Sequence, residues 1–133
     1  MTSTISIGRL TLRFISGNEH ATIFELGIPP GAKLPWPFYF RDVSETVYVV
    51  TGAFLTTFGD KRHELRAGEC LTIPAGTVHS YESYADHSSK AVVVLTPGSV
   101  TKNYFEEMAD EINGGADMMQ VQDIMRRHGL VPA

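Results

Sequence analysis

Residues 68–83 read GECLTIPAGTVHSYES, a stretch in which the glycines, the proline and the first histidine are regularly spaced. Five residues separate Gly68 from Pro74, one residue separates Pro74 from Gly76, and two residues separate Gly76 from His79. Glycine permits a tight corner, and proline ends the hydrogen-bonding ladder of a strand. The spacing therefore predicts two strands joined at a corner, with the imidazole of His79 pointing inward from the second strand.

The residues after His79 extend the second of these strands. Side chains two residues apart in a strand point to the same face, so we expect Tyr81 and Ser83 on the inward face with His79. Short runs rich in β-branched and aromatic residues surround this unit at intervals of roughly ten residues, which is typical of a β-sandwich or a small barrel. These runs are residues 10–16, 21–28, 45–50, 53–58, 63–67, 70–74 and 91–96.

Two connecting segments carry clear turn chemistry. Gly59 and Asp60 tolerate the positive φ of a hairpin turn and lie between two of the strand-like runs. Residues 28–37 read IPPGAKLPWP and contain four prolines, so they cannot form a central strand and predict a rigid loop at a rim. The sequence thus predicts an all-β barrel from about residue 5 to 96, within a single domain of residues 1–133.

After residue 96 the apolar residues follow a helical period. Tyr104, Phe105, Met108 and Ile112 form one helical face, and the sequence NGG at residues 113–115 ends it. A second helix is predicted by an Asp–x–x–Gln start and by an apolar stripe made of Met118, Val121 and Met125. Two short helices are expected at about residues 102–129. Their apolar stripes either pack on the outside of the sheet or form a lid over a ligand mouth.

The bulk composition excludes several classes of protein. The 133 residues are 43% hydrophobic and 20% charged, as is usual for one globular domain. Only 11 Lys and Arg residues and a net charge of -4 argue against nucleic-acid binding. No apolar run is long enough to span a membrane. The single cysteine, Cys70, and the lack of a secretory leader after Met1 favour a cytoplasmic location.

The spacing within residues 68–83 resembles the second conserved motif of the cupin superfamily, G(X)5PXG(X)2H(X)3N. Every position matches except the last, where Ser83 replaces asparagine. The resemblance extends over nearly the whole chain, which is similar to the small single-domain cupins called quercetin dioxygenase-like. That name is a family label and does not transfer an activity to this chain. It implies a double-stranded β-helix, the cupin jelly-roll barrel, followed by two short C-terminal helices.

The segment before residue 52 resembles the first cupin motif, G(X)5HXH(X)3-4E(X)6G. Glu45 stands in the position of the motif glutamate, with six residues between it and Gly52. Counting back over the four residues RDVS places Phe38 and Phe40 where the family has two histidines. With the register shifted by one residue, Pro37 and Tyr39 stand there instead. Neither phenylalanine can bind a metal.

In metal-dependent cupins, the two first-motif histidines, the glutamate and the second-motif histidine coordinate one divalent ion. By this resemblance only Glu45 and His79 remain here, and two ligands hold a catalytic metal poorly. We therefore expect no metal and no other cofactor. The remaining candidates are interpreted as surface or helix-end residues rather than ligands; they are Asp42, His20, His63, His87 and His128.

Without a metal, the interior would hold one carboxyl and one imidazole inside an apolar wall. The expected wall residues are Trp36, Phe38, Phe40, Val47, Val49, Tyr81 and Ser83. Either these side chains fill the barrel completely, or they line a ligand pocket. Buried polar groups are costly unless they are paired or meet a ligand, which favours a functional role for Glu45 and His79.

Three functions compete on this evidence. The first is a metal-independent enzyme of the isomerase, cyclase or dehydratase type, in which Glu45 and His79 act as a general acid/base pair on a small, partly apolar or aromatic molecule. The second is a non-catalytic module that binds such a molecule. The third is a metal-dependent, dioxygenase-like cupin with an unrecognised ligand set. A homodimer is also expected, because Tyr48 and Val50 alternate with the inward-facing Val47 and Val49 and so present apolar side chains on the outer face. The cover for these side chains could equally be the C-terminal helices.

Overall fold

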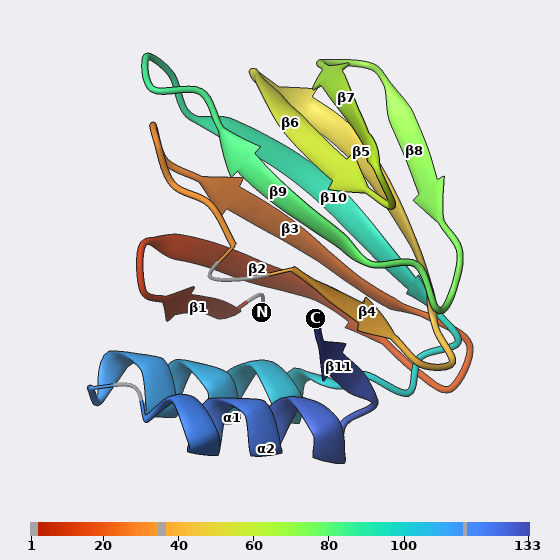
Figure 1. Ribbon diagram of the computed structural model, residues 1–133, viewed down its shortest axis with the longest axis vertical. Coiled ribbons are helices and arrows are strands. Elements are labelled where there is room, and N and C mark those ends of the chain that lie inside the picture. Colours follow the sequence, from red (N-terminus) through yellow and green to blue (C-terminus); the bar gives the residue numbers. More distant parts are fainter. Residues whose placement is uncertain (1–2, 35–36, 116) are drawn as a thin grey trace.

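The computed structural model describes residues 3–34, 37–115 and 117–133. The strands form two sheets that face each other, with two helices below them (Figure 1). The six-stranded sheet has the order β1-β2-β3-β10-β5-β8, and the five-stranded sheet has the order β11-β4-β9-β6-β7. The elements are β1 (Ser3–Ile7), β2 (Leu10–Gly17), β3 (Thr22–Ile28), β4 (Phe38–Phe40), β5 (Ser44–Thr51), β6 (Ala53–Phe58), β7 (Lys61–Arg66), β8 (Cys70–Ile73), β9 (His79–Ser83), β10 (Ser89–Thr96), α1 (Lys102–Asn113), α2 (Met118–Arg127) and β11 (Leu130–Pro132).

This architecture confirms the predicted double-stranded β-helix with two C-terminal helices. Each long strand alternates buried and exposed residues, as expected where one face of a sheet packs on a core. In β5, Val47 and Val49 are buried and Tyr48 and Val50 are exposed. In β9 the predicted inward set of His79, Tyr81 and Ser83 is buried.

The corner that the sequence predicts between β8 and β9 is present. Gly76 has a φ of 83°, a left-handed conformation that a residue with a Cβ atom rarely adopts. Its N–H donates to the carbonyl of Phe40, which attaches the corner to the end of β4. The corner thus fixes where β9 starts, and β9 starts with His79.

The turn between β5 and β6, which leads from the six-stranded sheet to the five-stranded sheet, is equally specific. Gly52 has a φ of 73°, and a Cβ atom there would lie 2.4 Å from the carbonyl oxygen of Ser88. The hairpin predicted at Gly59 also forms, joining β6 to β7 in an antiparallel pair.

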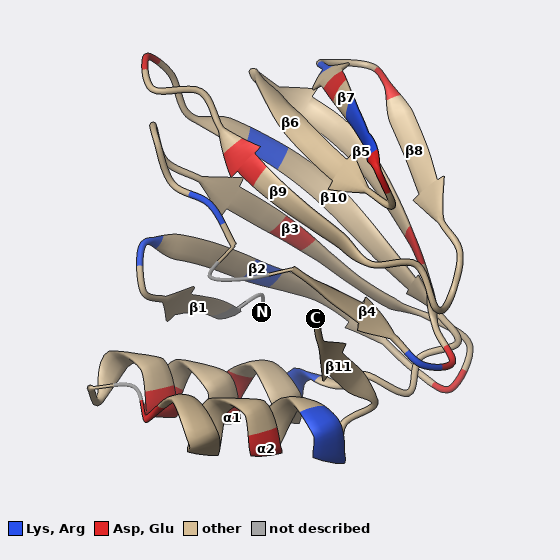
Figure 2. Ribbon diagram, in the orientation of Figure 1, with Lys and Arg blue, Asp and Glu red and all other residues tan. Residues whose placement is uncertain are grey.

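The helices cover one end of the barrel. Helix α1 packs against β1, α2 packs against α1, and β11 then pairs antiparallel with β4 (Figure 1). The Asp117 side chain caps α2 by accepting a hydrogen bond from the N–H of Met119. Figure 2 shows basic residues at the end of α2, where they complement the helix dipole.

The second helical stripe differs from its prediction at one residue. Val121 and Met125 are buried, but Met118 is 52% exposed because it lies in the first turn of α2. No helix among the described residues is long and apolar enough to cross a membrane.

Candidate functional site

The carboxyl group of Glu45 is the centre of the candidate site. Glu45 is the second residue of β5 and is only 4% exposed. It pairs in the sheet with Leu95, close to the end of β10 that leads into α1. This register places the carboxyl at the helical end of the barrel rather than in its middle.

The imidazole of His79 lies beside this carboxyl. Its Nδ1 is 3.0 Å from the carbonyl oxygen of Thr77, and because a carbonyl only accepts, Nδ1 must carry a proton. Its Nε2 is 3.1 Å from Oε2 of Glu45. The alignment of this contact leaves Nε2 without a hydrogen-bond partner among the described residues, so the contact is an ion pair rather than a directed hydrogen bond.

The protonation state of the pair follows from these contacts. Burial by itself would lower the pKa of His79, but the Glu45 carboxylate and the Thr77 carbonyl outweigh burial and raise it. A neutral imidazole with its proton on Nδ1 would direct a lone pair at the carboxylate. We therefore describe the pair as an imidazolium facing a carboxylate.

Tyr81 completes the cluster from the same strand as His79. Its hydroxyl donates to Oε2 of Glu45, the oxygen that also faces His79. Burial, the charge of Glu45 and this hydrogen bond raise the pKa of Tyr81 well above its usual value, so the phenol stays protonated. Both partners converge on Oε2, and no described residue donates a hydrogen bond to Oε1.

Two phenylalanines pack against the imidazole. The ring of Phe38 lies 4.6 Å from the ring of His79 and pairs with it across β4 and β9. The ring of Phe40 lies 6.0 Å from the same imidazole. Tyr39, between them, belongs to the opposite face of β4. The observed register therefore directs Phe38 and Phe40 to the site, rather than Pro37 and Tyr39.

A partly open apolar cavity of ≈ 110 Å³ adjoins the cluster. Glu45 and Tyr81 form part of its wall, together with Phe38 and Phe40. Its remaining described lining comes from the barrel end and from the helical cover. These residues are Ile7, Leu10, Leu12, Phe24, Leu26, Leu34, Val93, Tyr104, Phe105, Met108, Ile112, Met125 and Leu130. His79 contacts Glu45 from behind and is not part of this wall.

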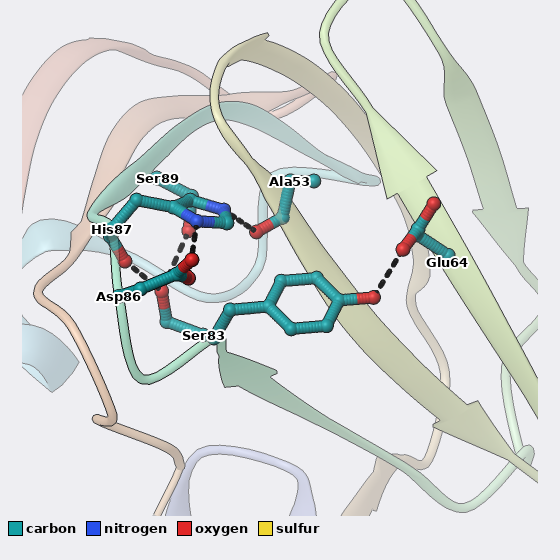
Figure 3. Close-up of polar contacts among 7 residues, drawn as sticks. Ala53, Glu64, Ser83, Asp86, His87 and Ser89 are labelled. Atoms are coloured by element: carbon teal, nitrogen blue, oxygen red, sulfur yellow. Dashed lines mark hydrogen bonds and ion pairs between the residues drawn. The ribbon is translucent and has the colours of Figure 1, made fainter.

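Three residues expected on the wall lie elsewhere. Val47 and Val49 point inward but follow Glu45 along β5, away from the helical end, and they pack in the core. Ser83 lies at the far end of β9, where its hydroxyl donates to the carbonyl of His87 and contacts Ser89 (Figure 3). These side chains therefore point to the same inner face of the barrel as Glu45 and Tyr81, but they lie too far along their strands to reach the cavity.

Trp36, the remaining expected wall residue, falls outside the described residues.

The residues that the sequence interpretation missed come from the cover. Tyr104, Phe105 and Met108 were identified as one helical face, and the structure turns this face to the cavity. Leu130 was missed because a three-residue strand carries little periodic signal. Of the second stripe, Met125 lines the cavity and Val121 is buried, while α1 packs against β1.

The residues present do not fit a cupin metal centre. Oε2 of Glu45 is already bound by Tyr81 and His79, and phenyl rings surround the imidazole. Among the residues that the structure describes, no group of three or more His, Cys, Asp or Glu side chains is arranged to hold a metal ion. His20 and His63 are exposed, while His87 and His128 pair with Asp86 and Glu107.

Solved structures with the same fold are numerous. KdgF from Halomonas sp. superposes with a TM-score of 0.66 at 17% identity, covering 71% of this chain and 86% of that chain. An RmlC-like cupin from Shewanella frigidimarina gives 0.65 at 19% identity, covering 73% and 85%. A sugar phosphate isomerase of the cupin superfamily from Silicibacter pomeroyi gives 0.62 at 23% identity, covering 68% and 60%. At these identities the likeness shows the fold alone.

No curated protein matches the chain. The model of the cupin domain, in contrast, matches residues 24–97, which run from β3 to the end of β10 and include Glu45 and His79. This match covers more than half of the sequence. The chain therefore belongs to the cupin domain family.

Proposed function

We propose that this cupin is a metal-independent acid/base enzyme that acts on a small, partly apolar or aromatic molecule by an isomerase, cyclase or dehydratase type of reaction. The observation that carries the proposal is the position of Glu45: a carboxylate held at Oε2 by Tyr81 and His79 lies in the wall of an apolar cavity. A carboxylate of this kind can accept a proton from a bound molecule.

The roles of the three polar side chains follow from their contacts. Glu45 is the group that meets the ligand and transfers the proton through Oε1. His79 lies behind it and stabilises the carboxylate through its positive charge. Tyr81 orients the carboxyl by donating to Oε2. The surrounding apolar wall excludes water, which strengthens the electrostatic interactions within the site.

The absence of a metal from the chemistry is part of the proposal. We infer that Phe38 and Phe40 replace the two first-motif histidines of metal-dependent, quercetin dioxygenase-like cupins. Their ring distances of 4.6 Å and 6.0 Å from the imidazole of His79 support this inference, because a phenyl ring beside the imidazole offers no nitrogen ligand to a metal. The same contacts argue against the metal-dependent alternative.

The lining of the cavity also limits the substrate. No Lys, Arg or His among the described residues lines it, so a phosphate group would find no cation there. We therefore do not transfer the sugar phosphate of the Silicibacter pomeroyi relative to this chain. The second candidate function is binding of a small apolar molecule without catalysis. The lining of the cavity, which is apolar on nearly every side, supports it.

Deuterium incorporation separates catalysis from binding. The purified protein is treated with a chelator and incubated in D2O with small carbonyl compounds and phenols, and incorporation at carbon is followed by NMR. We expect exchange that survives chelation and that Glu45→Gln abolishes, because glutamine keeps the shape but cannot accept the proton. Exchange that requires an added metal ion would overturn the proposal.

Glu64→Gln is the matched control. Glu64 is also a strand glutamate that accepts a hydrogen bond from a tyrosine, Tyr84, but it lies on β7 outside the cavity. Its variant should exchange at the wild-type rate. Binding of the compounds without any exchange would favour the second candidate function.

A further inference from the structure

Tyr104 is a polar residue of the cavity that no step above uses. It lies near the start of α1, is 5% exposed and lines the cavity from the helical cover. Its ring packs against Phe105 and His128. Burial raises the pKa of its phenol, with no charge or hydrogen bond contributing, so the hydroxyl remains protonated.

The hydroxyl of Tyr104 makes no hydrogen bond with any described residue. The oxygen of this hydroxyl is not fully enclosed by protein atoms, so its donor is free for a ligand. Packing alone would be served better by phenylalanine, which occupies the next position on the same helix. The hydroxyl thus has a free donor at a cavity where nearly every other group is apolar.

The barrel side of the cavity offers the complementary group. Glu45 lines it from β5, and Oε1 receives no hydrogen bond from the described chain. The Tyr81 hydroxyl, also on the barrel side, is committed to Glu45. The cavity wall therefore carries one free hydrogen-bond donor on its cover and one free acceptor in the barrel.

We propose that Tyr104 binds the carbonyl oxygen of a small apolar ketone or aldehyde while Glu45 faces a carbon next to that carbonyl. The proposal rests on the proposed function, to which it adds the substrate class and a second residue that contacts the substrate. An alcohol could accept a hydrogen bond from Tyr104 and donate its O–H to Glu45, but it offers no acidic C–H, whereas a ketone or aldehyde combines an acceptor oxygen with an acidic C–H.

The step balances within the site. Oε1 of Glu45 takes the proton from the carbon, and the electrons of the C–H bond move to the carbonyl oxygen to form an enolate. Tyr104 stabilises the negative oxygen by its hydrogen bond, as preorganised donors do for charge that develops during a reaction. Glu45 then returns the proton to a conjugated carbon, which yields the isomerised ketone. If the Glu45 carboxyl first exchanges its proton with solvent and then protonates the original carbon, the product is the exchanged ketone.

The cavity volume sets the size of a probe. A cavity of ≈ 110 Å³ is somewhat smaller than the roughly 150 Å³ cavity that accepts benzene, so a suitable probe has at most about six heavy atoms, as benzene does. Cyclopentanone meets this limit. Methylenecyclopentane has the same shape but carries a CH2 group in place of the oxygen, so the pair isolates the hydrogen bond to the carbonyl.

The test measures the dissociation constants of both probes by NMR titration of wild type, Tyr104→Phe and Tyr48→Phe. We expect wild type to prefer cyclopentanone by about tenfold, which is the size of one hydrogen bond. Tyr104→Phe should remove this preference without changing the affinity for methylenecyclopentane. Tyr48→Phe, a change at an exposed tyrosine of β5, should keep it.

The outcomes separate this inference from the proposed function. Equal binding of the two probes by wild type and by Tyr104→Phe, or binding of neither probe to wild type, would overturn the role of Tyr104. Deuterium exchange that depends on Glu45 would still support acid/base chemistry. A preference that depends on Tyr104, without any exchange of the cyclopentanone α-protons, would instead support the carbonyl site and contradict catalysis.

Discussion

The Nδ1 atom of His79 determines the charge state of the buried cluster. Because it donates to the Thr77 carbonyl, only Nε2 is left to face Glu45, and an attractive contact there requires a second proton on the ring. The ring is 1% exposed, so water cannot replace either partner. His79 therefore stabilises the carboxylate as a fixed cation behind it.

This charge state predicts a pH dependence of stability. The pKa of His79 is raised in the folded state, so its stabilisation is fully present below the unfolded-state pKa of about 6.5 and is lost as pH rises through the folded-state pKa. We expect the free energy of unfolding to be higher for wild type than for His79→Gln. This difference should be largest at about pH 6 and should shrink as the pH approaches about 9. Chemical denaturation at several pH values measures this difference.

His20→Gln controls for the loss of one imidazole from the chain, because His20 lies on the surface. If the difference in free energy of unfolding between wild type and His79→Gln stays constant or grows as the pH rises, the ion pair is contradicted.

The two helices and the last strand act together as a cover for the barrel end. Helix α1 contributes the cavity side chains Tyr104, Phe105 and Met108, and α2 contributes Met125. Strand β11 fastens this cover to the barrel by pairing with β4, which also carries Phe38 and Phe40. The same strand pair therefore holds the cover and positions part of the site.

Truncation of Leu130 should loosen the cover. Leu130 is 3% exposed, lines the cavity and pairs with Phe40, so Leu130→Ala removes packing on both sides of the β11–β4 contact. We expect a loss of about 2–5 kcal/mol in the free energy of unfolding. Hydrogen exchange should show faster opening of α1 and α2 than of β5 and β10.

Val131→Ala serves as the matched change in the same strand, because the Val131 side chain is only partly buried. It should cost less stability and leave the exchange of the helices near wild type. Equal effects of the two variants would show that the cover does not depend on Leu130.

The sequence predicted the elements that carry periodic or turn signals. The glycines and the proline of residues 68–83 correctly placed the corner and the inward imidazole, because their backbone requirements are local. Strands β4 and β11 were not identified: each has three residues, and their pairing joins segments about 90 residues apart. Tyr104 was recognised as part of a helical face, but only the tertiary arrangement shows that this face meets Glu45.

The outer face of the six-stranded sheet remains open in the single chain. Tyr48 and Val50 on β5 are 47% and 40% exposed, and Ile15 on β2 is 42% exposed. The helices do not cover β5, since α1 packs against β1 and α2 against β11 (Figure 1). Apolar side chains in this arrangement favour contact with a second copy of the chain.

We expect a homodimer that uses this face. Light scattering should give twice the chain mass of 14.6 kDa, and Tyr48→Glu combined with Val50→Lys should return the protein to one chain mass. Met119→Glu is the control, because Met119 is the most exposed apolar residue of α2, at 81%, and this helix does not cover β5. A single-chain mass for wild type at micromolar concentration would contradict the dimer.

The fastening of the cover by β11 also has a consequence for biosynthesis. A ribosome that has just finished β10 still has about 35 residues to add before Leu130, which takes roughly 2–7 s at typical elongation rates. During that interval the ribosomal exit tunnel still encloses the most recently made residues, so β9 and β10 emerge while the helices are being added, and the barrel can assemble only shortly before its cover. Its aromatic end is then accessible to chaperones and to small apolar molecules, which the arriving helices can enclose.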